Sequence, residues 1–200
     1  YYFTLAANQN NPNAQYLLGN IYLLNKCKVQ NIDKSILYYT LASNQNHSEA
    51  QYMLGCIYYE GKYVHQNIEK SIQYFTMAAN QNHVIAQYNL SVIYLRGDLV
   101  PKDISKGLNY LELSANQGYS YSQFILGEYF LDPEFTLLDV NKAIYYLTLA
   151  ANSNNSSAQF ELGFLYHEGQ LIPRDINKSI YYLLQSANQN NPEAQYYIAW

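Results

Sequence analysis

The chain has 200 residues, of which 49% are apolar and 13% charged, and its formal net charge is −4. This composition supports a sizeable buried core and lies far from that of disordered chains. The acidic balance argues against a nucleic-acid partner, which would need clustered Lys and Arg. No apolar run approaches the roughly 18 to 20 residues of a membrane-spanning helix, so no membrane span is expected.

The sequence repeats with a period of 36 residues, the size of a two-helix repeat. The triplet Ala-Gln-Tyr, or a close variant, starts at residues 14, 50, 86, 122, 158 and 194. This spacing predicts a single array over residues 1–200. Its expected units are the end of a partial repeat at 1–10, the complete repeats 11–46, 47–82, 83–118, 119–154 and 155–190, and the start of a further repeat at 191–200.

Each repeat begins with a helical pattern of about 12 to 14 residues, called helix A. In the first repeat Ala14, Leu18 and Tyr22 share one face, which we expect to be buried. Asn11 and Pro12 mark the start of this helix. Asn can cap the first turn, and Pro is tolerated at the first helical position because a backbone N–H there would have no partner within the helix. A small residue at one recurring position implies a close helix crossing. These small residues are Gly19, Gly55, Ser91, Gly127, Gly163 and Ala199.

A short loop leads to the second helical pattern, helix B, whose first turn an Asn or Asp is expected to cap. The capping residues are Asn31, Asn67, Asp103, Asp139 and Asp175. In the fourth repeat Pro133 stands where other loops have Gly, as at Gly61. Because Pro cannot adopt a positive φ, we expect that loop to take a different backbone path.

A Lys lies three residues after each of these caps, at residues 34, 70, 106, 142 and 178. A cation in the first turn opposes the helix dipole. We therefore expect the stem of each Lys to pack on a neighbouring aromatic ring while its ammonium reaches a loop carbonyl or an acid.

The Asn-rich runs such as Asn-Gln-Asn at residues 8–10 fall at the junctions between repeats. Their third residue is Asn or Gly in every unit, and these are the two residues most at ease in the left-handed conformation that ends a helix. The positions are Asn10, Asn46, Asn82, Gly118, Asn154 and Asn190. The runs are therefore predicted to be ordered corners rather than low-complexity tracts.

The residues that most often carry chemistry are sparse and scattered. His47, His65, His83 and His167 are the only imidazoles, and they are interpreted as surface or helix-capping residues. The two cysteines, at residues 27 and 56, are too isolated for a disulfide framework or a metal site, and the cytoplasm is the favoured compartment. No phosphate-binding Gly loop or nucleophile motif is present. We therefore expect no catalytic residue, metal or cofactor.

The recurring frame A-x-A-Q-[YF]-x-L-G-x-x-Y, a Gly-containing loop, [ND]-I-x-K-[SA]-I-x-Y-[YF] and A-[AS]-N-Q-[NG] resembles the Sel-one-like repeat (SLR) family of tetratricopeptide-like solenoids. The resemblance covers essentially the whole chain. It implies an all-α, right-handed superhelix of antiparallel helix pairs, and it implies that the protein acts as an adaptor in protein complexes. The paired cysteines of some secreted bacterial members are missing here.

Positions that differ between repeats are released from packing and can serve recognition. One face of helix A, offset from the buried one, changes character in every repeat, and the resemblance implies that it lines a concave groove. We call these positions the helix A ladder. Its candidate binding residues are Met53, Cys56, Glu60, Ile85, Asn89, Val92, Arg96, Tyr121, Ile125, Glu128, Asp132, Glu161, Phe164, Glu168, Tyr197 and Trp200.

The leading hypothesis is a non-catalytic scaffold or adaptor that binds a peptide or protein segment in this groove. The acids Glu128, Asp132, Glu161 and Glu168 favour a basic partner. Because the chain lacks a start Met and begins and ends within a repeat, it is expected to be a window of a longer protein. It could then be the accessory array of a larger signalling enzyme, for example a protein kinase. A purely structural spacer is the third hypothesis, and the oligomeric state stays open.

Overall fold

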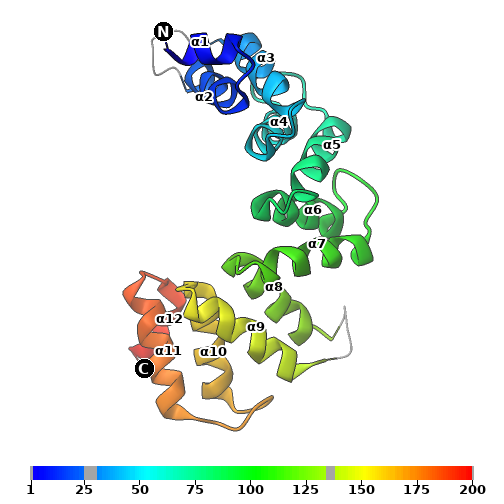
Figure 1. The fold of residues 1–200 in the computed structure, drawn as a ribbon. Helices are drawn as coiled ribbons and strands as arrows, with labels where there is room; N and C mark the ends of the chain where they lie inside the picture. Colours follow the sequence, from blue (N-terminus) through cyan, green and yellow to red (C-terminus); the bar gives the residue numbers. More distant parts are fainter. Residues whose placement is uncertain (1, 25–30, 134–137, 200) are drawn as a thin grey trace. The chain divides into compact units, whose positions relative to one another are not determined.

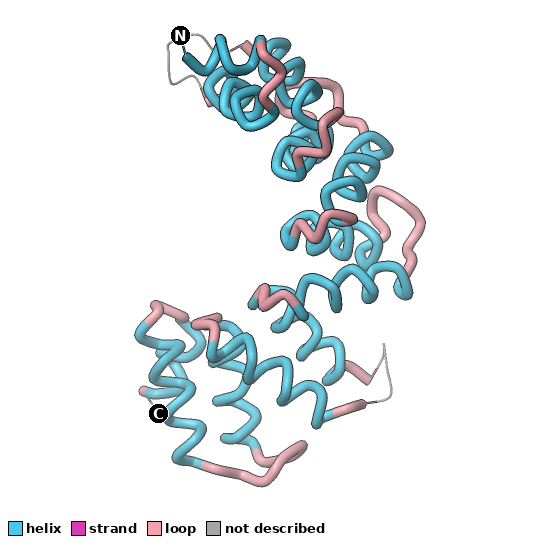
Figure 2. Tube along the Cα trace, in the orientation of Figure 1, coloured by secondary structure: helices cyan, strands magenta, loops and turns pink. Residues whose placement is uncertain are grey.

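The computed structural model describes residues 2–24, 31–133 and 138–199, and the regular elements within these ranges are all α-helices (Figures 1 and 2). They are α1 (Tyr2–Asn8), α2 (Pro12–Leu23), α3 (Ile32–Ser43), α4 (Ser48–Glu60), α5 (Ile68–Ala79), α6 (Val84–Arg96), α7 (Ile104–Asn116), α8 (Ser120–Leu131), α9 (Val140–Asn152), α10 (Ser156–Glu168), α11 (Ile176–Asn188) and α12 (Pro192–Ile198). The even-numbered helices are the helices A of the repeats, and the odd-numbered ones are the helices B.

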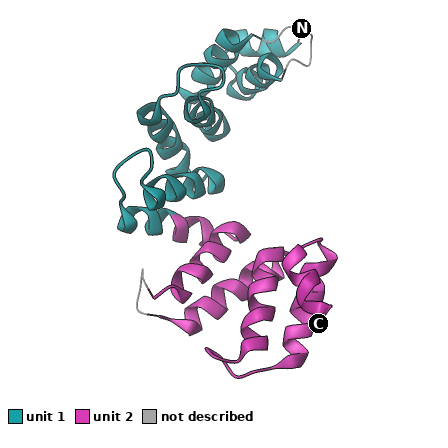
Figure 3. Cartoon of the chain, turned by 180° about the vertical axis from the view of Figure 1, so that it is seen from behind, with its two compact units in different colours: residues 1–110 teal, residues 111–200 magenta. Residues whose placement is uncertain are grey.

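The chain divides into two compact units, residues 1–110 and 111–200 (Figure 3). In unit 1, α2 packs on α3 and α4 on α5, and α3 and α5 each also contact the following helix A. In unit 2 the same holds for α8 with α9 and for α10 with α11, and α9 and α11 contact the next helix A. Each of α3, α5, α9 and α11 is thus shared between two helices A, which is the packing of an α-solenoid. The all-α, 36-residue helix-pair array expected from the sequence is confirmed.

The helices begin directly after the capping residues that the sequence indicated. Asn31 Oδ1 accepts from the backbone N–H of Lys34 at 2.9 Å, and the four equivalent Asn and Asp residues make the same contact at 2.9–3.0 Å. Asn11 caps α2 in the same way, with Pro12 in the first turn. Each such cap stabilises its helix by about 1 kcal/mol.

The corner between repeats is built around a residue in the left-handed conformation. Asn46 has φ of 61°, its N–H donates to Ser43 O at 2.9 Å, and His47 N–H donates to Ala42 O at 3.2 Å. This pair of bonds is a Schellman motif. A positive φ is present at Asn10, Asn46, Asn82, Gly118, Asn154 and Asn190. The predicted ordered corners are confirmed. The side chain of the residue that closes the motif also caps the next helix A, except at Tyr119.

The recurring small residue of helix A lies where helix B of the same repeat crosses it. A Cβ on Gly55 would lie 2.5 Å from the ring of Phe75, so no side chain fits there. Gly19, Gly127 and Gly163 meet the equivalent helix B residues at 2.5–2.7 Å. In the third repeat the glycine is on the other helix, because Ser91 replaces it on α6 while Gly107 of α7 approaches Leu95.

The loops between helices A and B close in one common way. Asn67 N–H donates to Tyr58 O at 2.9 Å, and each equivalent cap residue donates to the equivalent carbonyl at 3.0–3.1 Å. Most of these helices A end on a left-handed glycine such as Gly61, whereas α8 ends at Leu131 and Asp132 is extended, with φ of −88° and ψ of 110°. Asp132 precedes Pro133, which disfavours helical backbone before it. The described start of this loop thus follows a different path, as predicted, and residues 134–137 lie outside the described residues.

A buried glutamine joins each corner to the repeat that follows. Gln51 Nε2 donates to Ser43 O at 3.2 Å, and Gln81 Nε2 donates to Gln51 Oε1 at 2.6 Å. Gln159 is held in the same way by Gln189. Gln123 Oε1 is instead buried without a hydrogen-bond partner among the described residues. The position that supplies the donating glutamine elsewhere is occupied there by Ser153, which is too short to reach.

The recurring Lys residues lie on the loop side of the repeats, and their arrangement differs from the expectation. The ammonium itself, rather than the stem, lies over an aromatic ring of helix A, with Nζ of Lys106 4.3 Å from the Tyr94 centroid. The other four Lys residues lie 4.9–5.3 Å from equivalent rings. Lys142 and Lys178 also reach an acid of the described part of the chain, at 3.6 and 3.8 Å. The cation–π contact brings the charge to the ring face, where the quadrupole attracts it.

Candidate functional site

Two of the four histidines, His47 and His83, cap helices, and His65 is exposed. His47 Nδ1 accepts from Ala50 N–H and His83 Nδ1 accepts from Ala86 N–H, so both rings are helix caps. In the described part of the chain, no group of three His, Cys, Asp or Glu side chains could hold a metal ion. Among the described helices, none is both long and apolar enough to cross a membrane.

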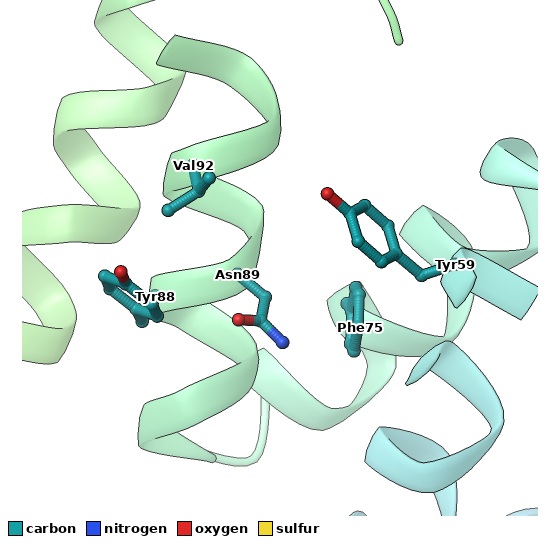
Figure 4. Close-up of a pocket in the computed structure, with 5 residues that line it drawn as sticks. All are labelled: Tyr59, Phe75, Tyr88, Asn89 and Val92. Atoms are coloured by element: carbon teal, nitrogen blue, oxygen red, sulfur yellow. The ribbon is translucent and has the colours of Figure 1, made fainter. Parts of the chain in front are cut away.

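A surface depression in unit 1 lies between two successive helices A. It is a pocket of about 120 Å³ lined by Tyr59 from α4, Phe75 from α5, and Tyr88, Asn89 and Val92 from α6 (Figure 4). Apolar walls with few polar groups are typical of sites that take an apolar side chain.

The pocket continues along α6 into a smaller depression. Tyr59 and Val92 line both, and Arg96, Asp98 and Leu99 belong to the smaller one. Arg96 is exposed at the end of α6 and carries a positive charge beside the apolar wall. Together the two depressions form a furrow, which we call the α4/α6 furrow.

Asn89 is the polar group that could orient a ligand in this furrow. Figure 4 shows its amide turned toward Phe75, with the ring of Tyr59 across the pocket. The amide is half-buried and makes no hydrogen bond with any other described residue. A free amide offers two donors and one acceptor, so it can pair with both the N–H and the C=O of an extended peptide.

The other ladder residues of unit 1 are less available. Met53 and Cys56 are half-buried and pack against core clusters, and burial raises the pKa of the Cys56 thiol to about 11. That thiol is therefore neutral and unreactive at ordinary pH. Glu60 is exposed at the end of α4, and Ile85 is 39% exposed at the start of α6.

In unit 2 the ladder brings two carboxyl groups together. Burial raises the pKa of Glu128 on α8, and the charge of Glu161 on α10 raises it further. Burial also raises the pKa of Glu161. Glu128 is still exposed as a residue, so an approaching cation can reach the pair. When two carboxylates have lost part of their hydration, a Lys or Arg placed between them stabilises their charged forms.

Next to these acids unit 2 carries an aromatic group. Phe160 and Phe164 of α10 pack on Tyr197 of α12, with ring centroids 5.7–6.2 Å apart. Phe164 and Tyr197 are ladder residues and both are half-buried. The ladder thus combines an aromatic surface with a carboxyl pair in this unit.

The remaining predicted residues of unit 2 vary in exposure. Tyr121 is 57% exposed, Ile125 and Asp132 are half-buried, and Glu168 is exposed at the end of α10. Trp200 lies outside the described residues.

Sequence reasoning missed Tyr59, Phe75 and Tyr88 in the larger depression of the α4/α6 furrow, and Ile93, Asp98 and Leu99 in the smaller one. Phe75 and Tyr88 occupy positions that are aromatic or leucine in other repeats, and this pattern indicates core residues. Tyr59 carried a signal, because the equivalent residues are Leu23, Leu95 and others of different size. A position that varies in this way indicates release from strict packing.

The comparisons with known proteins agree with this architecture. A family model for the Sel1 repeat matches residues 1–11, 12–47, 48–83, 84–119, 120–155 and 156–191. No curated protein sequence matches the chain.

Among solved structures, a Sel1 repeat protein from Oxalobacter formigenes superimposes with a TM-score of 0.87 at 27% identity, over 99% of this chain and 57% of that one. A protective antigen of uropathogenic Escherichia coli strains, which displays an SLR fold, gives 0.87 at 26% identity over 97% of this chain and 42% of its own. An immunity protein from Pseudomonas aeruginosa gives 0.57 at 18% identity, over 96% of this chain and 74% of that one, and shows the fold alone.

The chain thus spans about half the length of the two more similar structures. The family-model matches cover nearly all of it, repeat by repeat. It therefore belongs to the Sel1-repeat family, whose solenoid is typically non-catalytic and whose members generally act as protein-interaction scaffolds.

Proposed function

We propose that this chain is a non-catalytic scaffold that binds an extended segment of a partner protein along the ladder faces of its helices A. The observation that carries this proposal is the α4/α6 furrow of unit 1. It combines apolar and aromatic walls with the free amide of Asn89 and the exposed Arg96. An apolar side chain of the partner fills the pocket, and Asn89 bonds the partner's backbone.

In unit 2 the ladder favours a basic residue of the partner. A Lys or Arg beside Glu128 and Glu161 removes the repulsion between two carboxyls that burial has partly desolvated. The rings of Phe164 and Tyr197 supply apolar contact close to that charge. The partner segment of unit 2 is therefore basic with apolar neighbours.

The test is selection of a random-peptide phage library on the wild-type chain, followed by affinity measurements on substituted chains. Val92→Arg fills the furrow with charge and should abolish binding of the apolar peptides that were selected. The matched control is Leu37→Arg, because Leu37 is 54% exposed on a helix B of the same unit. Equal loss of binding with both variants, or selected peptides that tolerate Val92→Arg, would contradict the furrow.

The charge component has its own measurement. Basic peptides that bind unit 2 should associate more slowly with Glu161→Gln, and their binding should depend less on salt concentration. An unchanged salt dependence would show that the carboxyl pair does not contact the partner. The alternative of an accessory array in a larger signalling enzyme has no specific observation in its favour, and we do not propose it.

A further inference from the structure

A second pocket, of about 370 Å³, lies in unit 2 where the start of α9, the end of α10 and the loop before α11 meet (Figure 1). Its apolar lining includes Ile144, Tyr166 and Ile172, and its polar lining includes Asn141 and Arg174. None of these residues belongs to the helix A ladder. The pocket is therefore independent of the surface on which the proposed function rests.

The polar groups of this pocket are available to a ligand. Arg174 and Asn141 are exposed and make no side-chain hydrogen bond or ion pair with any other described residue. Lys178, also in the lining, is partly engaged, because its Nζ lies 3.8 Å from Asp175 Oδ2 and 4.9 Å from the Tyr166 centroid. Two cations against one carboxylate leave a net positive charge on the rim of an apolar pocket, within a chain that is acidic overall.

The equivalent positions of other repeats do not combine these features. At the position of Asn141, the first three repeats carry Asp33, Glu69 and Ser105. At the position of Arg174, the repeat that follows each of these carries Gln66, Lys102 and Leu138, respectively. The boundary between the second and third repeats comes nearest, since it has Lys102, but Glu69 there cancels its charge. At the boundary between the fourth and fifth repeats, the neutral amide of Asn141 is combined with the cation of Arg174.

We propose that this pocket binds a carboxylate side chain of a partner polypeptide, with a neighbouring aliphatic residue on the apolar lining. The guanidinium of Arg174 matches a carboxylate with two parallel hydrogen bonds, and the Asn141 amide can add a third. The single net positive charge suits a monoanion rather than a dianionic phosphate. The volume leaves room beside the carboxylate for an aliphatic side chain on Ile144 and Ile172.

The test is a titration of the isotope-labelled chain, followed by NMR, with three acetylated and amidated pentapeptides. They share two leucines that flank a central Glu, Gln or phosphoserine. The Glu peptide should shift the Asn141 side-chain amide and the Arg174 Nε–H signals in a saturable manner. Arg174→Ala should weaken this binding about tenfold, as expected for the loss of a charged hydrogen bond. Asn141→Glu, which copies the second repeat, should abolish it.

Both substitutions are at exposed positions, so an unchanged circular dichroism spectrum will show that the fold is intact. The conservative variant Asn141→Gln keeps an amide and should retain most of the affinity. If the Gln peptide binds as tightly as the Glu peptide, the pocket recognises only the apolar side chains, and the proposal is overturned. Tighter binding of the phosphoserine peptide would assign the site to phosphate instead. Absence of saturable shifts with the Glu peptide, or full affinity in Asn141→Glu, would also overturn it.

Discussion

The cap at His47 makes a pH-dependent contribution to stability that one substitution should remove. The ring stacks on Tyr16 with centroids 4.8 Å apart, and its Nδ1 accepts from Ala50 N–H at 3.2 Å. Because Nδ1 accepts, the neutral ring carries its proton on Nε2, which lies 3.1 Å from Asn13 Oδ1 and donates to it. A second proton would occupy Nδ1 and remove the cap.

The direction of the effect follows from the pKa of His47. Burial lowers that pKa below its ordinary value of 6.5, and the charge of Glu49 opposes the shift in part. The unfolded chain therefore binds the proton more readily than the folded one. The stability that the neutral cap supplies is fully present above pH 6.5 and is lost as the pH falls through the lowered value. An N-terminal cap is worth about 1 kcal/mol, or about 2 to 4 °C in Tm for a chain of this size.

The assay compares thermal and urea unfolding of the wild type and His47→Asn at about pH 7.5 and pH 5. Asn occupies the equivalent position at Asn11 and Asn155, where it caps the helix without titrating. Relative to the wild type, the variant should gain about 1 kcal/mol between the higher and the lower pH, while the lost stack on Tyr16 lowers its stability at both. Comparison of the two chains at each pH cancels the titration of other groups.

His83→Asn is the matched control. His83 caps α6 in the same way, but its Nε2 lies 3.2 Å from Glu49 Oε2. At about pH 7.5 His83→Asn should keep the cap of α6, because Asn supplies the same acceptor, so it tests whether Asn can replace a capping His elsewhere in the chain. If the wild type and His47→Asn lose stability in parallel on acidification, the neutral-cap argument is refuted.

Substitutions at two further sites test the packing within a repeat. Ser153→Gln should stabilise unit 2 by about 0.5 to 1.5 kcal/mol in urea unfolding, because its amide can donate to the unpartnered Gln123 Oε1; Ser153→Glu, which lacks the donor, should bring no gain. Gly55→Ser should destabilise unit 1 by about 1 to 3 kcal/mol, because its Cβ would meet the buried ring of Phe75 at 2.5 Å. A loss well below about 1 kcal/mol would refute the argument that the Phe75 ring leaves no room for a Cβ at this position.

The sequence by itself determined the repeat length, the helix boundaries and the corners. Each of these depends on contacts within a few residues, such as the cap from Asn31 to Lys34 or the left-handed Asn46, and such contacts require particular residue types at fixed spacing. Because the sequence repeats every 36 residues, the assignments made in one repeat apply to the equivalent positions of the others.

The tertiary structure decided which surface residues are available. The pattern placed Met53 and Asn89 in the same ladder position, but Met53 packs against a core cluster while the Asn89 amide is free in the α4/α6 furrow. The buried link from Gln81 to Gln51 joins residues 30 apart and had no local signature. Such contacts depend on how helices that are distant in the sequence pack on one another, within a repeat and between repeats, and the 36-residue period does not encode that packing.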